Sequence, residues 1–381
     1  MIGLPEKVLV RYANLVRRNV QTSRMNSHRQ YRFFVTAACG AIFATGLFAQ
    51  ESRWNGLNQQ MVEFYRNGHY AEGIPVASEA EKVAEATFGP NHPNVANSLN
   101  NLAEMYRPLG RYAEAKPLYE RALRIGEASV GVDSPLVAAI LSNMGEMYRA
   151  QGDYGRAEPL YRRAISIREK ALGPDHPDLA QTLNNLALLY AAENKPLDAE
   201  PLYQRAMGIY RKTFGEDHQL VAACMSNLAE LYRGQHKFSL AAPLYQKAIE
   251  INEKVGGPDN PRVAMDLNNQ ALLYAADNKP KDAERTFQQA MAIQEKVFGP
   301  QDPALITTLN NLASFYQNQG RYPDAALFFQ RVLQISEKNM GANNPSLAGT
   351  LENLAAVYKK MGQNQEADKL TARARNLTAH R

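Results

Sequence analysis

An asparagine returns every 42 residues along most of this chain, and the residues around it return as well. The segment "LNNLALLYAAENKPLDAEPLYQRAM" (183–207) is followed 84 residues later by "LNNQALLYAADNKPKDAERTFQQAM" (267–291). A fixed period of this length is typical of a stacked repeat array, in which each unit packs only against its neighbours. Such an array has no single central pocket and usually presents a long binding surface. The repeated asparagines are Asn101, Asn143, Asn185, Asn227, Asn269, Asn311 and Asn353.

Each 42-residue unit contains two amphipathic segments. The first has an apolar stripe with the spacing of one helix face, as in Val95, Leu99, Leu102, Ala103 and Tyr106. The second has another stripe, as in Ala115, Leu118, Tyr119, Ala122 and Ile125. The pattern therefore predicts a helical hairpin per unit. Residues that tolerate a positive φ separate the two helices: Gly68, Gly110, Gly152, Asn194, His236, Asn278, Gly320 and Gly362.

A second turn sequence, such as "GPDHP" (173–177), separates one unit from the next. Its histidines, His92, His176 and His218, lie on different units, so we expect them to cap helices rather than share a metal ion.

Prolines also occur near the start of the second segment. We expect them in the first helical turn, where the missing N–H has no partner to lose: Pro117, Pro159, Pro201 and Pro243.

The order and spacing of Ala103, Tyr106, Gly110, Ala115, Tyr119 and Ala122 resemble the tetratricopeptide repeat. The 42-residue period is similar to the kinesin-light-chain type of that repeat, and the resemblance covers residues 52–378. It implies an all-α fold, a right-handed α-solenoid superhelix of about eight helix-turn-helix repeats. The heptad coiled coil of motor-associated members does not occur here, so motor binding is not carried over.

The resemblance also implies that the first helix of each pair lines the concave surface, where the repeated asparagines hydrogen-bond the backbone of a bound peptide. An amide suits this role because it has both donors and an acceptor. The alternative is that these side chains bridge neighbouring helices and only stabilise stacking.

Three and six residues after each asparagine, the residues expected to line the concave surface differ from unit to unit. Some units have a glutamate and an arginine, and others have Leu188 with Ala191 or Leu272 with Ala275. This variation can determine which partner binds. The alternative is an i,i+3 ion pair that stabilises its own helix by ~0.2–0.5 kcal/mol. The charged pairs are Glu104 and Arg107, Glu146 and Arg149, and Glu230 and Arg233.

The first 49 residues have the pattern of a targeting segment. Seven of the chain's 43 basic residues and one of its 38 acidic residues lie there, followed by the uncharged run "FFVTAACGAIFATGLFA" (33–49). This order predicts a secretory signal cleaved after Ala49, and hence export to a periplasmic or extracellular location. An uncleaved membrane anchor remains the alternative, with membrane contact through residues 33–49 only. Either Met1 or Met25 fits the start of such a segment.

The remainder of the chain has a net charge of −1, which gives no basic excess for nucleic-acid binding. It contains a single cysteine, Cys224. The repeat position that it occupies is mostly polar elsewhere, so we expect a partly exposed, unreactive thiol. No nucleophile or phosphate-loop motif and no metal-binding spacing occurs. We therefore expect no enzyme activity, catalytic residue, metal, cofactor or small-molecule substrate.

The function predicted is a scaffold that binds an extended peptide or partner protein. The alternative is a structural subunit of an envelope complex that uses its convex face or its ends.

Overall fold

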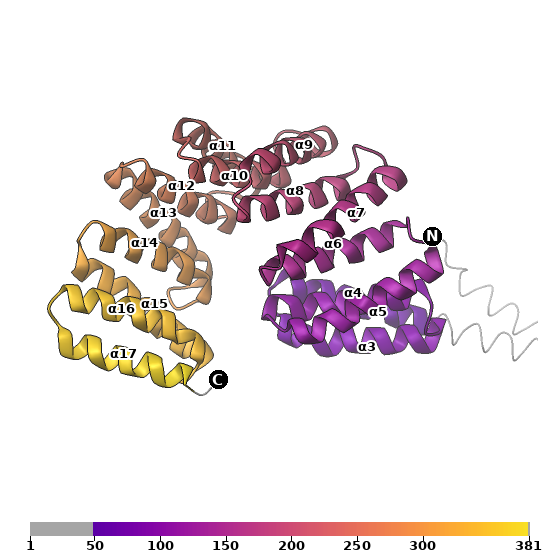
Figure 1. Cartoon of the computed structure of the whole chain (residues 1–381), viewed down its shortest axis with the longest axis horizontal. Helices are drawn as coiled ribbons and strands as arrows, with labels where there is room; N and C mark the ends of the chain where they lie inside the picture. The colour runs from indigo at the N-terminus through magenta and orange to yellow at the C-terminus, as the bar shows by residue number, and fades with distance from the viewer. Residues whose placement is uncertain (1–48, 380–381) are drawn as a thin grey trace, which may run out of the picture. The chain divides into compact units, whose positions relative to one another are not determined.

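The computed structural model describes residues 49–379, which form eight successive pairs of α-helices (Figure 1). No strand occurs in this part of the chain. The chain divides into two compact units, Met1–Ile125 and Gly126–Arg381, with the division inside helix α5. The predicted all-α repeat fold is confirmed.

The first unit contains the helix 49–66, α3 (Tyr70–Phe88), α4 (Pro93–Tyr106), a 3₁₀ turn (Arg107–Leu109) and the start of α5 (Tyr112–Val130). Its apolar core includes Met61, Leu102 and Met105. The Trp54 indole N–H donates a hydrogen bond to Ser98 Oγ (2.8 Å), which ties the helix 49–66 to α4.

The second unit is a row of six helix pairs. Each first helix packs against the second helix of its own pair, and each second helix packs against the next first helix. The first helices α6, α8, α10 and α12 also contact the next first helix in turn, so the row of contacts runs from α6 to α14. The helices are α6 (Pro135–Ala150), α7 (Tyr154–Leu172), α8 (Pro177–Ala192), α9 (Pro196–Phe214), α10 (Gln219–Gly234), α11 (Phe238–Gly256), α12 (Pro261–Ala276), α13 (Pro280–Phe298), α14 (Ile306–Asn318), α15 (Tyr322–Met340), α16 (Ala348–Lys360) and α17 (Asn364–Thr378).

The turns adopt the predicted conformations. Gly152 has φ 76°, and even His236, which lacks the freedom of glycine, has φ 58°. Between repeats the linker histidines act as helix caps, as predicted. His176 Nδ1 accepts a hydrogen bond from the backbone N–H of Asp178 (3.2 Å), and His92 and His218 make the same contact.

The prediction for the prolines of the second helices was wrong. These helices begin before the expected first turn: α5 begins at Tyr112, so Pro117 is its sixth residue rather than part of its first turn. The helices continue because the prolines lie on the exposed side. Water can bond there to the carbonyl group that each proline leaves without a donor. The same holds for Pro159, Pro201 and Pro243.

The predicted partial exposure of Cys224 was also wrong, whereas a protonated, unreactive thiol agrees with the structure. Its side chain is 2% exposed, and burial raises the pKa of the thiol to about 12, which keeps it protonated. Polar residues at this repeat position are buried as well, and neighbouring helices supply hydrogen-bond partners for several of them. Arg168, for example, bonds to Thr182. The buried residues of this position are Ser98, Ile140, Thr182, Cys224, Asp266 and Thr308.

None of the helices within residues 49–379 is both long and apolar enough to cross a bilayer. The predicted targeting segment lies outside the described residues, except for its last residue, Ala49.

Candidate functional site

The seven repeated asparagines all lie on first helices, at the same position of each. Six are half-buried and Asn353, on α16, is exposed. On each first helix, buried apolar residues lie beside the asparagine, as Leu183 and Leu186 do beside Asn185. They pack against the second helix and so fix the orientation of the asparagine. We call the side of α6, α8, α10, α12, α14 and α16 that carries these asparagines the first-helix face.

Three of the asparagines bridge neighbouring repeats. In each, the side-chain N–H donates to an asparagine 43 residues earlier: Asn101 to Asn58 (3.3 Å), Asn227 to Asn184 (3.0 Å) and Asn311 to Asn268 (3.0 Å). These three side chains therefore bridge neighbouring first helices, as the alternative reading predicts, and whether they also bind a ligand is untested by these contacts. Asn143 also has an interaction partner. Peptide binding by the seven residues stays a prediction.

Asn185 and Asn269 differ from the bridging asparagines. The residue 43 positions earlier is a serine in both cases, Ser142 or Ser226, and the Ser226 hydroxyl instead donates to Asp266 Oδ1 (2.6 Å). Among the described residues Asn185 forms no side-chain hydrogen bond. Asn269 only accepts one, from Asn268 (3.2 Å). Both amides therefore keep their N–H donors available to a ligand.

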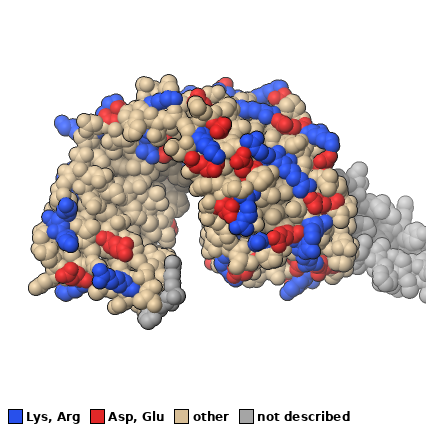
Figure 2. Space-filling view, viewed as in Figure 1, with Lys and Arg blue, Asp and Glu red and all other residues tan. Residues whose placement is uncertain are grey.

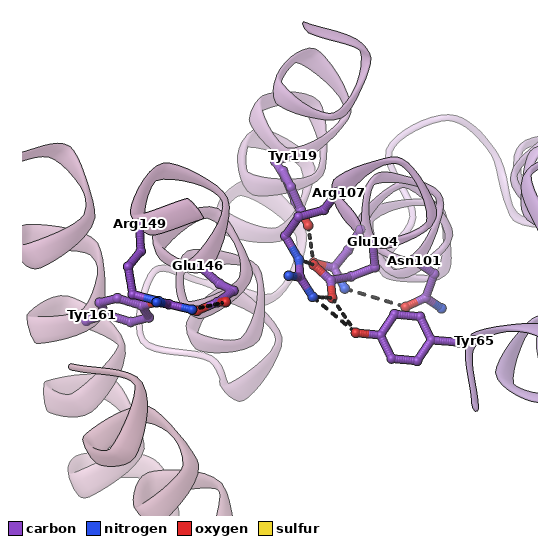
Figure 3. Close-up of polar contacts among 9 residues, drawn as sticks. Tyr65, Asn101, Glu104, Arg107, Tyr119, Glu146, Arg149 and Tyr161 are labelled. Atoms are coloured by element: carbon purple, nitrogen blue, oxygen red, sulfur yellow. Dashed lines mark hydrogen bonds and ion pairs between the residues drawn. The ribbon is translucent and has the colours of Figure 1, made fainter. Parts of the chain in front are cut away.

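The predicted Glu–Arg pairs are present, and each is also tied to the core. In the first unit Glu104 accepts hydrogen bonds from Arg107 (3.0 Å), from the Tyr119 hydroxyl and from the Tyr65 hydroxyl (3.4 Å) (Figure 3). Tyr119 lies on α5, the second helix of the same pair, and is fully buried. The pair therefore joins the two helices of its repeat as well as successive turns of α4.

The same arrangement recurs in the second unit. Glu146 accepts from Arg149 (2.6 and 2.9 Å) and from the buried Tyr161 hydroxyl (2.9 Å) (Figure 3). Burial, together with the nearby Glu146 carboxylate, raises the pKa of Tyr161. The hydrogen bonds that Arg149 donates to the Glu146 carboxylate raise the pKa of Arg149. Both residues thus keep their protons, and the charges of the ion pair largely cancel.

The residue at the glutamate position of a first helix is related to the core aromatic residue of the second helix, which was missed in the sequence. The glutamate position and the core aromatic lie 15 residues apart, and Glu230 accepts from Tyr245 (3.0 Å). Where the glutamate is replaced by Leu272, the aromatic is Phe287, which needs no acceptor. Tyr203, opposite Leu188, is the exception. Comparing the two positions repeat by repeat would have revealed this.

A buried carboxylate was missed as well. Asp266 is 6% exposed and accepts from Ser226 and from Asn252 Nδ2 (2.7 Å). Burial raises its pKa above the ordinary value. Asn252 Oδ1 has no hydrogen-bond partner in this part of the chain. The cluster joins α10, α11 and α12, so it belongs to the junction between two repeats.

Charges of both signs lie intermingled on the face shown in Figure 2. Within residues 49–379 no group of three or more His, Cys, Asp or Glu side chains is placed to hold a metal ion. On a second helix, α15, the residues Leu327, Gln330 and Arg331 line a shallow hollow of about 470 Å³. Within residues 49–379, the first-helix face and this hollow both offer contacts to a partner.

A model of the tetratricopeptide repeat matches residues 58–128, 136–212, 195–254, 240–296 and 304–378. The chain belongs to the tetratricopeptide-repeat family. A comparison with curated proteins finds no match.

Among solved structures, this tetratricopeptide-repeat chain is similar to BtubC (BKLC) from P. vanneervenii, at 26% identity. The match covers 60% of this chain and 89% of BtubC, with a TM-score of 0.49. A putative kinesin light chain from Podosopora anserina matches at 25% identity over 54% of this chain and 96% of that one, with a TM-score of 0.48. A Rap protein complexed with competence and sporulation factor matches at 15% identity over 87% and 98%, with a TM-score of 0.54. The last similarity concerns the fold alone.

Proposed function

We propose that this tetratricopeptide-repeat protein is an interaction scaffold that binds an extended peptide, or an extended segment of a partner protein, across its first-helix face. The observation that carries the proposal is the row of contacting first helices, on which the carboxamides of Asn185 and Asn269 keep their N–H donors available to a ligand. Because an amide can pair with any peptide group, such a row suits a ligand that is read along its backbone.

Membership of a family whose usual role is protein interaction supports the proposal. The absence of catalytic motifs from the sequence supports a non-enzymatic role. The near-neutral charge of residues 50–381 argues against nucleic acid as the ligand, because phosphate binding requires a basic excess.

One observation favours the alternative, a subunit that assembles through its second helices. Leu327 on α15 is 60% exposed at the hollow described above, where an apolar side chain of a partner can pack.

Photo-crosslinking from two matched positions distinguishes these roles. Met265 on the first-helix face is 61% exposed, nearly the same as Leu327. We replace each in turn with a photoreactive phenylalanine analogue in the full chain and irradiate cells that produce it. A defined adduct from position 265 alone supports the scaffold. An adduct from position 327 alone contradicts it and supports the assembly subunit.

We also propose that the protein is exported, with residues 1–49 as a cleaved signal and an uncleaved anchor as the alternative. The support is the order of basic and apolar residues in this segment. A fusion of residues 1–60 to a reporter active only outside the cytoplasm tests it. A soluble, inactive reporter would exclude both forms, and N-terminal sequencing of an exported product distinguishes cleavage from retention.

A further inference from the structure

The repeated asparagines are not equivalent, and the difference bears on which ligand the proposed scaffold takes. The inference drawn here rests on that proposed function. Asn185 on α8 and Asn269 on α12 donate no side-chain hydrogen bond within residues 49–379. Asn227, on α10 between them, uses an N–H to bridge to Asn184 (3.0 Å). A ligand that bonds to Asn185 or Asn269 displaces no internal bond, whereas one that draws Asn227 away from Asn184 breaks the bridge.

The two available asparagines also have different neighbours from the rest. Next to Asn185 along the face lies Leu188, and next to Asn269 lies Leu272. Both leucines are only half-buried, so part of each apolar side chain is in contact with solvent. Met265, one turn before Asn269, is 61% exposed. Each free amide therefore lies beside an apolar surface that a ligand side chain can cover.

The two helices that carry these positions have few charged residues. Between Asp178 and Glu193, α8 has no charged residue. On α12 the only charges are Arg262, at the start of the helix, and the buried Asp266. A charged ligand group placed over Leu188 or Leu272 would lose water without gaining a partner.

The helix between them contributes no unpaired charge. On α10 the Glu230 carboxylate accepts from Arg233 Nε (2.8 Å) and from the Tyr245 hydroxyl (3.0 Å). The hydrogen bonds with Glu230 raise the pKa of Arg233, so the pair remains charged and closed on itself. The lining from α8 to α12 is therefore neutral overall.

The spacing of the two positions fixes the length of the ligand. The first helices α8, α10 and α12 contact one another in turn. Packed helices lie ~8–10 Å apart, so α8 and α12 are separated by roughly 20 Å. An extended chain advances ~3.3 Å per residue, so about six residues span this distance.

We propose that α8, α10 and α12 bind an uncharged extended peptide segment that carries two apolar side chains about six residues apart. Asn185 and Asn269 donate to its backbone carbonyl groups, and the two apolar side chains cover Leu188 and Leu272. Asn227 serves only as a bridge between repeats.

The test begins with a probe of unbiased sequence. The full chain is immobilised and used to select from a phage library of random dodecapeptides. The affinity of the enriched peptides is then measured by fluorescence anisotropy for the wild-type chain and three variants. Asn185→Ala and Asn269→Ala remove the free donors, and Asn227→Ala is the matched control on the helix between them. Circular dichroism checks that each variant keeps its helices.

We expect enriched peptides poor in Lys, Arg, Asp and Glu, with apolar residues about six apart. Asn185→Ala and Asn269→Ala should each weaken binding by about 2- to 13-fold, the range for one hydrogen bond. Asn227→Ala should change it by less than about twofold. Should Asn185→Ala lose helix, Asn185→Asp replaces it, because this variant keeps the shape and lacks the N–H donors.

Each contrary result has a distinct meaning. Charged peptides, or an Asn227→Ala variant as weak as Asn185→Ala, refute this inference but leave the scaffold function intact. A library that enriches no peptide at all contradicts both the inference and the binding of extended peptides by the first-helix face.

Discussion

The contact between Glu146 and Tyr161 should be the strongest polar link between α6 and α7. The Tyr161 ring is fully buried, and its hydroxyl donates to the Glu146 carboxylate (2.9 Å). A hydrogen bond to a charged group contributes about 1.5–3 kcal/mol to stability. Tyr161→Phe should therefore lower the free energy of unfolding by about that amount. Glu146→Leu should lower it at least as much, because it leaves the hydroxyl buried without an acceptor and Arg149 without its partner.

The two changes should not add. When both are made, neither half of the bond remains, so the double variant should be more stable than the sum predicts by about 1.5–3 kcal/mol. Adding Arg149→Ala reproduces the arrangement that Leu272, Ala275 and Phe287 already form in α12 and α13. We expect the free energy of unfolding of this triple variant to lie within about 1.5 kcal/mol of the wild-type value, because well-packed apolar substitutions change stability little.

Urea unfolding of the full chain, followed by circular dichroism, measures these energies. Tyr203→Phe is the matched control. Tyr203 is 1% exposed and lies opposite Leu188, and its hydroxyl forms no hydrogen bond among residues 49–379. Tyr203→Phe should therefore change the free energy of unfolding only slightly. Equal effects of Tyr161→Phe and Tyr203→Phe, together with simple additivity of Glu146→Leu and Tyr161→Phe, would refute the reasoning.

Four further variants probe the caps, the buried carboxylate and the coupling of repeats. His218→Ala should cost about 0.5–2 kcal/mol in urea unfolding by removing the cap of α10, while His218→Asn, which copies Asn260, should cost much less. Burial raises the pKa of Asp266 above 3.8, so its contribution to stability is fully present below that pH and is lost as pH rises through the raised value. Asp266→Asn should therefore raise the urea midpoint more at pH 7 than at pH 4, and an equal shift at both would contradict this account. Tyr190→Ala should cost about 3–5 kcal/mol and increase hydrogen exchange in α7 as well as α8, because the Tyr190 hydroxyl donates to Glu158 (2.7 Å); a change confined to α8 would argue against coupled repeats.

Much of the fold was predictable because the signals that determine it are local and repeated. The helical periodicity, the turn at Gly152 and the capping role of His176 each follow from a few consecutive residues. The start of the second helices was mispredicted because Pro117 was treated as a boundary. An exposed proline is tolerated within a helix when water reaches the freed carbonyl group.

The site was predicted less completely, because its features depend on pairs of residues in different helices. Whether Asn227 or Asn185 is available to a ligand depends on the residue 43 positions earlier, an asparagine in one case and a serine in the other. Cys224 was placed at the surface because polar neighbours in the repeat frame were read as exposed. In the structure such polar residues are buried with partners from the adjacent helix, as Asp266 is with Asn252.

The most direct test of the proposed binding surface uses the methionine methyl groups of the wild-type chain as NMR probes. The chain has 12 methionines, and two of them report on different surfaces. Met265 lies on the first-helix face and is 61% exposed, whereas Met340 ends the second helix α15 and is 44% exposed. During titration with a peptide selected from the library, the Met265 methyl signal should shift or broaden in proportion to occupancy while that of Met340 stays in place. A shift of Met340 with an unchanged Met265 would contradict binding at the first-helix face.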